Sequence, residues 1–155
     1  MQFCSNSPTE IWNTTFLFMQ SLLYVSRSVI PHHEAEVRVS ELAAQAAESN
    51  AASGITGGLI FSGEHFAQIL EGDSASLDQL MASISRDARH VEATTLFRSE
   101  IAKRRFEGWD LAYAGTSRFV SGHITPLLSE KSVGATRTLV VKLVQLIEEF
   151  ATFSR

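Results

Sequence analysis

The sequence predicts one α+β domain in which two helices cover one face of a mixed sheet. Three observations support this prediction. The chain has 155 residues, of which 45% are hydrophobic and 19% charged, and this is the size and balance of a single globular core. Short strand-like runs alternate with two stretches of helical periodicity. A longer amphipathic stretch follows the last strand-like run, and we expect it to cover the other face of the sheet.

The first strand is expected over residues 22–26, where side chains alternate between two faces and Tyr24 lies on one of them. The next element is a helix whose apolar residues recur at helical spacing. We expect this helix to begin at Ser40 or nearby and to end at Gly54. Asn50 therefore falls on the apolar face of the first helix.

Residues 58–62 and 65–71 are typical of two strands joined by a tight turn, which is the pattern of a hairpin. On the second of these strands Phe66, Gln68 and Leu70 share a face. This alternation predicts that the amide of Gln68 lies among apolar side chains.

A second helix is expected to begin at Ser74 or Ser76 and to end near residues 89–90. Residues 94–97 and 109–113 supply two more strands. The resulting order is βαββαββ, which matches the ferredoxin-like split βαβ arrangement with both helices on one face of the sheet.

The chain divides into a core domain with an extension on each side. Residues 1–19 are expected to form an N-terminal extension, residues 20–115 the core, and residues 116–155 the C-terminal capping and oligomerisation helices. The wide apolar face over residues 133–153 should cover the sheet or a second subunit, so we expect a homo-oligomer. Met19 stands directly before the first strand, which leaves open whether translation begins there.

Composition excludes several classes of function. The net charge is −4 and the dense cations are confined to residues 103–105, so direct nucleic-acid binding is not expected. Cys4 is the single cysteine and the five histidines lack metal-ligand spacing, so we expect no disulfide and no metal site. The apolar stretch 16–25 is too short to span a bilayer, and no cation precedes Arg27 as in a secretory signal. We therefore expect a cytoplasmic protein with no membrane contact.

Polar side chains recur on faces that the pattern assigns to the core. They are Tyr24, Asn50 and Gln68. Leaving such a buried group without a partner costs about 1–3 kcal/mol. A planar ligand with ring carbonyls and ring nitrogens would supply partners to all of them, whereas bonds to the backbone or to one another are the alternative.

Five blocks of the sequence, between about residues 22 and 115, resemble the BLUF family, the blue-light sensors that use FAD. Taken singly each block is a weak signal, but together they follow the order of the family. The blocks are Tyr24 to Arg27, Ser49 to Gly57, Phe66 to Gly72, Arg86 to His90 and Ile101 to Trp109.

The resemblance implies a role for each matching residue. Tyr24 would be the photoactive electron and proton donor, Gln68 the glutamine that bridges tyrosine and flavin, and Trp109 a further photoactive residue. Asn50 would hold a ring carbonyl of the flavin, which the family binds between its two parallel helices. Further flavin contacts would come from Ser26, Ile84, Arg86, Asp87, Arg89 and His90, although the charged residues at the end of a helix are often solvated or mutually paired.

The same resemblance implies a photoreceptor that is not itself an enzyme and that signals in trans to a downstream effector protein. FAD is the expected cofactor, with FMN or riboflavin as the other flavins. One departure is Leu111, which stands where the family commonly has methionine. Because leucine has no thioether to rearrange near Gln68, the output is expected to be weaker or to pass through Trp109, for which simple core packing is the alternative.

Two other functions stay open at this point. A ferredoxin-like enzyme of the acylphosphatase type would need an anion-binding loop with a positioned arginine after the first strand, and Arg27 with its neighbours supplies no convincing backbone cradle. A BLUF-like interaction module that has lost light sensing is opposed by the presence of Tyr24, Asn50 and Gln68 and favoured by Leu111.

Overall fold

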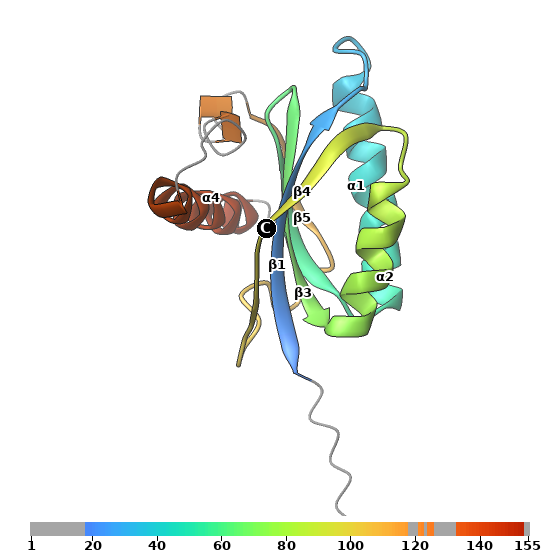
Figure 1. Ribbon diagram of the computed structural model, residues 1–155. Helices are drawn as coiled ribbons and strands as arrows, with labels where there is room; N and C mark the ends of the chain where they lie inside the picture. Colours follow the sequence, from blue (N-terminus) through green and yellow to red (C-terminus); the bar gives the residue numbers. More distant parts are fainter. Residues whose placement is uncertain (1–17, 118–120, 123, 126–132, 154–155) are drawn as a thin grey trace, which may run out of the picture.

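The computed structural model describes residues 18–117, 121–122, 124–125 and 133–153 (Figure 1). Residues 1–17 of the predicted N-terminal extension, and much of the linker after the core, lie outside these residues, and Met19, predicted as the end of the extension, begins β1. The described strands and longer helices are β1 (Met19–Ser28), α1 (Ala35–Ala52), β2 (Thr56–Phe61), β3 (His65–Asp73), α2 (Ser74–Ser85), β4 (His90–Glu100), β5 (Ala112–Thr116) and α4 (Val133–Phe153).

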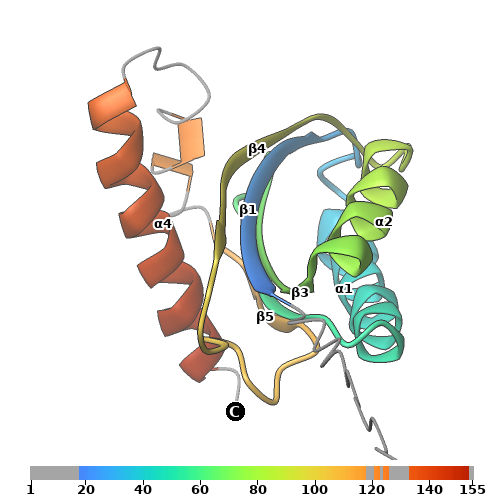
Figure 2. The same cartoon turned by 60° about the horizontal axis from the view of Figure 1, so that its bottom comes forward.

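The predicted ferredoxin-like α+β fold is confirmed. The strands form one sheet in the order β4-β1-β3-β2-β5, in which β1 is antiparallel to both β3 and β4, and β2 is parallel to β5. α1 and α2 lie on one face of this sheet, and α4 lies on the other (Figures 1 and 2). No helix in the described part of the chain is long and apolar enough to cross a membrane.

Both predicted helices on the first face have different ends in the structure. α1 begins at Ala35, five residues before Ser40, and its first turn is supported by an ion pair between Arg38 and Glu34 at 2.9 Å. It ends at Ala52, two residues before the predicted stop at Gly54, whose φ of +65° suits glycine.

The predicted end of the second helix near residues 89–90 is wrong, because α2 stops at Ser85. Residue 86 caps the helix, and the side chain of Asp87 accepts a hydrogen bond from the main-chain N–H of Arg89 at 2.9 Å. A side chain that bonds to the nearby backbone in this way competes with the helical ladder. Asp87 and Arg89 therefore lie in a loop, and His90 begins β4.

The prediction that Trp109 lies on the last strand is also wrong. β5 begins only at Ala112, and Trp109 lies in a turn in which its N–H donates to the carbonyl of Phe106 at 3.0 Å. Gly108 permits this turn through a φ of +83°. The carbonyl of Trp109 in turn accepts from the N–H of Gly57 at 3.0 Å, so the turn is attached to β2.

Each face of the sheet has its own apolar core. The core under α4 combines sheet residues with one stripe of that helix, namely Leu23, Val25, Ile60, Ala67 and Ile69 with Leu143, Val144, Ile147 and Ala151. The core under α1 and α2 includes Val39, Ala43, Leu59, Phe61 and Phe66 near α1 and Leu22, Leu70 and Leu77 near α2. Polar groups that lie between the sheet and α1 or α2 are therefore enclosed by apolar side chains.

Replacing Gly57 with alanine is expected to lower the free energy of unfolding by about 1–3 kcal/mol, because overpacking of a tight site costs this much. A Cβ at this position of β2 would overlap the carbonyl oxygen of Ile69 on β3. Urea denaturation followed by far-ultraviolet circular dichroism measures the loss. Gly122→Ala is the matched control because nothing lies within 4 Å of its Cβ position, and equal losses in both variants would contradict the close approach of the strands.

Candidate functional site

A cavity of about 240 Å³ opens between α1 and α2 over the sheet. It is somewhat smaller than the roughly 300–1,000 Å³ of a typical ligand pocket, so it suits a ring system of a larger ligand better than the whole of it. The predicted site residues that line it come from β1, α1, β3, α2, the loop before β4 and the first residue of β4. They are Tyr24, Asn50, Gln68, Ile84, Asp87, Arg89 and His90.

Tyr24 and Gln68 form the polar floor of the cavity. They are direct partners in the antiparallel register of β1 and β3, and the Tyr24 hydroxyl donates to Oε1 of Gln68 at 2.5 Å. Their exposed fractions are only 4% and 5%. Burial, and secondly the negative charge of Asp87, raise the pKa of Tyr24 far above its usual value. The phenol therefore stays protonated and serves as the donor of this bond.

Asn50 lies on the last turns of α1 with an exposed fraction of 1%. Its Nδ2 donates to the main-chain carbonyl of Asp110 at 2.8 Å, in the segment before β5. Its Oδ1 is buried and has no hydrogen-bond partner among the described residues. Asn50 thus joins the cavity to the segment before β5 and keeps an acceptor for a ligand.

His90 contributes a second buried polar atom to the cavity. Its Nδ1 has no hydrogen-bond partner in the described part of the chain, and its ring lies 6.5 Å from that of Tyr24 between centroids. Because an unpaired buried polar atom costs about 1–3 kcal/mol, these groups fit a ligand that brings its own donors and acceptors. The polar edge of a flavin ring, with carbonyls and ring nitrogens, has that chemistry.

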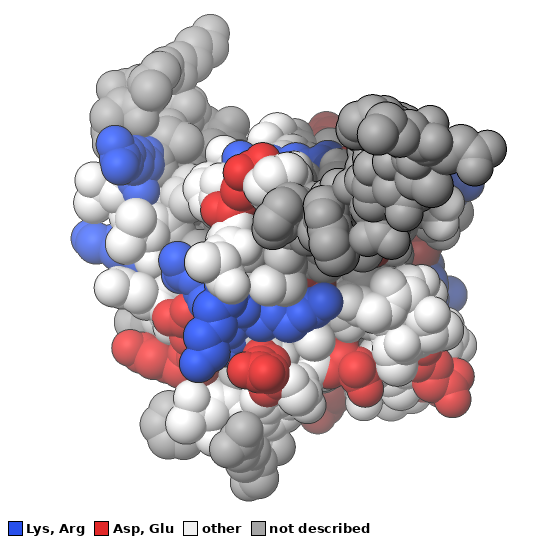
Figure 3. Space-filling model, turned by 90° about the horizontal axis from the view of Figure 1, so that it is seen from below, with Lys and Arg blue, Asp and Glu red and all other residues white. Residues whose placement is uncertain are grey.

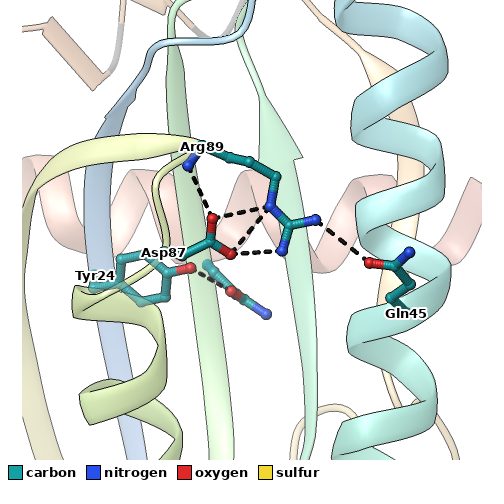
Figure 4. Close-up of polar contacts among 5 residues, drawn as sticks. Tyr24, Gln45, Asp87 and Arg89 are labelled. Atoms are coloured by element: carbon teal, nitrogen blue, oxygen red, sulfur yellow. Dashed lines mark hydrogen bonds and ion pairs between the residues drawn. The ribbon is translucent and has the colours of Figure 1, made fainter.

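An ion pair borders the cavity on the side of α1 (Figure 4). Nε of Arg89 donates to Oδ1 of Asp87 at 2.9 Å, and its NH2 donates to Oδ2 at 2.5 Å. NH1 of Arg89 reaches Oε1 of Gln45 on α1 at 3.4 Å. The hydrogen bond from Arg89 holds the pKa of Asp87 below its usual range. The loop before β4 is thereby tied to α1, and a negative charge is kept close to Tyr24.

Other predicted site residues are not among those that line the cavity. Ser26 is fully buried on β1, and its Oγ has no partner within the described residues. Arg86 is exposed where α2 ends. Trp109 packs against the apolar core under α4, on the opposite face of the sheet. Its packing follows from its place in the turn before β5, and Leu111 instead packs with the core next to α1.

Gln45 and Ser49 also line the cavity, although neither was predicted as a site residue. A signal for them was present. One side of the first helix carries residues spaced by three, four and one positions, namely Leu42, Gln45, Ser49 and Asn50. Reading that side as a cavity wall would have identified both residues together with Asn50.

The chain is similar to several known proteins. A family model described as BLUF, sensors of blue-light using FAD, matches residues 19–112. The chain is 31% identical over 93 residues to photoactivated adenylate cyclase subunit beta of Euglena gracilis, covering 60% of this chain and 11% of that protein. It is 33% identical over 88 residues to the blue light- and temperature-regulated antirepressor BluF of Escherichia coli, covering 57% of this chain and 21% of the relative. It therefore spans only a small part of these curated relatives.

A solved structure matches over most of both chains. The dark-state structure of BlrB, a BLUF protein, superposes with a TM-score of 0.69 at 27% sequence identity. The match covers 85% of this chain and 96% of that chain. The similarity thus extends beyond the segment matched by the family model.

Proposed function

The chain belongs to the BLUF family, and from this premise we propose that it is a blue-light photoreceptor that holds FAD in the cavity between α1 and α2. The observation that carries the proposal is the buried hydrogen bond from Tyr24 to Gln68 on the cavity floor. Support comes from Oδ1 of Asn50 and Nδ1 of His90, two buried polar atoms that lack hydrogen-bond partners among the described residues. The family's cofactor is a flavin, and FMN and riboflavin are the alternatives to FAD.

The proposed chemistry follows from these side chains. When bound, the flavin supplies absorption of blue light and an excited state that accepts an electron. Tyr24 would give an electron to the flavin and release its phenolic proton along the hydrogen bond to Gln68, and both would later return to Tyr24, so that no net oxidation remains. Gln68 then rotates or tautomerises, which exchanges the donor and acceptor ends of its amide. A stronger hydrogen bond to a flavin carbonyl would lower the excitation energy and shift the absorption to the red.

The proposal assigns separate roles to the parts of the chain. Residues 20–115 form the flavin-binding domain, residues 1–19 extend it, and residues 116–155 cap the sheet and mediate oligomerisation. The chain is not an enzyme by itself and acts in the cytoplasm on a separate effector protein. Relatives named as a cyclase subunit and as an antirepressor support an output through other domains or partners.

The acylphosphatase-type alternative has no support at the end of β1. Nε of Arg27 pairs with Oε2 of Glu92 at 3.2 Å instead of standing free over an anion-binding loop. The side chain is therefore engaged with β4, and the enzyme hypothesis loses the arginine that it needs.

An absorption spectrum recorded in the dark and after blue light tests the proposed function. We expect a flavin spectrum that shifts slightly to the red under light and relaxes back in the dark. Chromatography of the flavin released by denaturation distinguishes FAD, FMN and riboflavin. A folded protein without flavin would overturn the proposal, and bound flavin without a shift would favour the interaction module that has lost light sensing.

A further inference from the structure

Glu71 is a fully buried carboxylate on β3, two residues before the end of the strand that also carries Gln68. Its two oxygens accept hydrogen bonds from the main-chain N–H of Arg105 at 3.1 and 3.0 Å, and one of them accepts from the N–H of Phe106 at 3.1 Å. The described residues supply no ion-pair partner to this carboxylate. Its charge is therefore held by the backbone of the loop between β4 and β5.

The two residues that Glu71 holds both contact α4 or its core. Arg105 forms an ion pair with Glu148 at 3.4 Å. Phe106 is buried in the core under α4, and a Cβ added to Gly58 would touch both its ring and Ile147. The carboxylate of Glu71 thus holds the main chain of two residues whose side chains contact α4 or its core.

A second set of bonds fixes the loop to the same end of the sheet. NH1 of Arg104 donates to the main-chain carbonyl of Glu71 at 2.7 Å and to Oγ1 of Thr56 at 2.9 Å, and NH2 donates to the carbonyl of Gly54 at 2.8 Å. Lys and Arg side chains gather on the end of the molecule shown in Figure 3, with Asp and Glu side chains beside them. In the loop, the guanidinium groups of Arg104 and Arg105 bind elements of the chain itself, so they serve to position the loop.

β3 connects the cavity to this loop, because it carries both Gln68 and Glu71. Side chains alternate along a strand, so Gln68 faces the cavity while Glu71, three residues later, faces the side of α4. Charge-assisted hydrogen bonds in a buried site are strong, whereas an exposed ion pair such as that of Arg105 contributes little. A displacement of β3 would therefore move the loop with it. The contacts between the loop and α4 would change first, because they are weaker than the bonds between the loop and Glu71.

We propose that Glu71 is a positioning residue that couples β3 to α4, so that a rearrangement at Gln68 reaches α4 through the backbone of residues 105–106. This inference rests on the proposed photoreceptor function and names the route of its output. This path to α4 does not depend on the methionine that Leu111 replaces. It also does not require the side chain of Trp109 to lie in the cavity.

Hydrogen–deuterium exchange of the flavin-loaded full-length protein, in the dark and under blue light, tests the coupling. In the unsubstituted protein we expect light to change exchange in residues 103–108 and in residues 137–153. Glu71→Gln replaces one acceptor oxygen with an N–H donor that faces the donors of the loop. We expect this variant to keep the red shift and to lose the light-dependent change in residues 137–153. Glu107→Gln, at an exposed position of the same loop, is the matched control and should behave like the unsubstituted protein.

The outcomes separate this inference from the proposed function. Absence of the red shift in the unsubstituted protein would refute the photoreceptor itself. A red shift together with an unchanged response of residues 137–153 in Glu71→Gln would overturn the coupling alone. If Glu71→Gln does not fold, the unsubstituted protein still decides: a light response in residues 137–153 without one in residues 103–108 excludes the route, and a response in both supports it.

Discussion

Tyr24→Phe is expected to abolish the light-induced red shift while the protein stays folded and yellow. The substitution removes only the hydroxyl that donates to Oε1 of Gln68 at 2.5 Å. Phenylalanine has no phenolic proton to release, so the proposed transfer of an electron with a proton cannot take place. The ring still fills the same apolar site, and the other cavity residues that would contact the flavin are unchanged.

Stability provides a second measurement on the Tyr24 variant. Leaving the buried acceptor of Gln68 without its partner should cost about 1–3 kcal/mol of the free energy of unfolding, which urea denaturation in the dark measures. Tyr113→Phe is the matched control, because Tyr113 is the other tyrosine of the chain and is not among the residues that line the cavity. A normal red shift in Tyr24→Phe, with flavin bound, would remove Tyr24 from the photochemistry.

Gln68→Ala should have an equally large effect for a different reason. It removes the acceptor of the Tyr24 hydroxyl and with it the amide that can exchange donor and acceptor ends. The phenol then has no relay to the flavin, so we expect bound flavin and no red shift. The absorption difference between light and dark measures this loss.

A glutamine at the border of the cavity serves as the control for Gln68. Gln45→Ala removes an amide that accepts from Arg89 at 3.4 Å but does not contact Tyr24 through any hydrogen bond given by the structure. Its red shift should persist, with at most weaker retention of flavin. Loss of the shift in Gln45→Ala and its survival in Gln68→Ala would reverse the two roles.

The sequence was sufficient to predict the residues on the cavity floor. Alternation along the strands placed Tyr24 and Gln68 on one face, and helical periodicity placed Asn50 opposite them, because burial repeats with the period of each element. The order of elements and the ferredoxin-like sheet followed from the same periodicities. These features depend on local patterns that recur along the chain.

What the sequence did not predict depends on contacts between distant segments or on single side chains. The end of α2 is set by Asp87, which binds the N–H of Arg89, and the position of Trp109 is set by a turn at Gly108. The partners of Glu71 are main-chain N–H groups 34 and 35 residues away. Hydrophobic patterning carries no information on such bonds, because main-chain donors are present at almost every residue.

The direct pairing of Tyr24 with Gln68 across β1 and β3 determines where the chain tolerates insertions and deletions. A one-residue deletion between Phe66 and Gln68 would turn the amide to the opposite face of the sheet, because side chains alternate with a period of two. Added residues in the segment 29–34, between β1 and α1, would leave the pairing intact. Natural variation in length, and any peptide inserted by design, should therefore accumulate in that segment and avoid both strands.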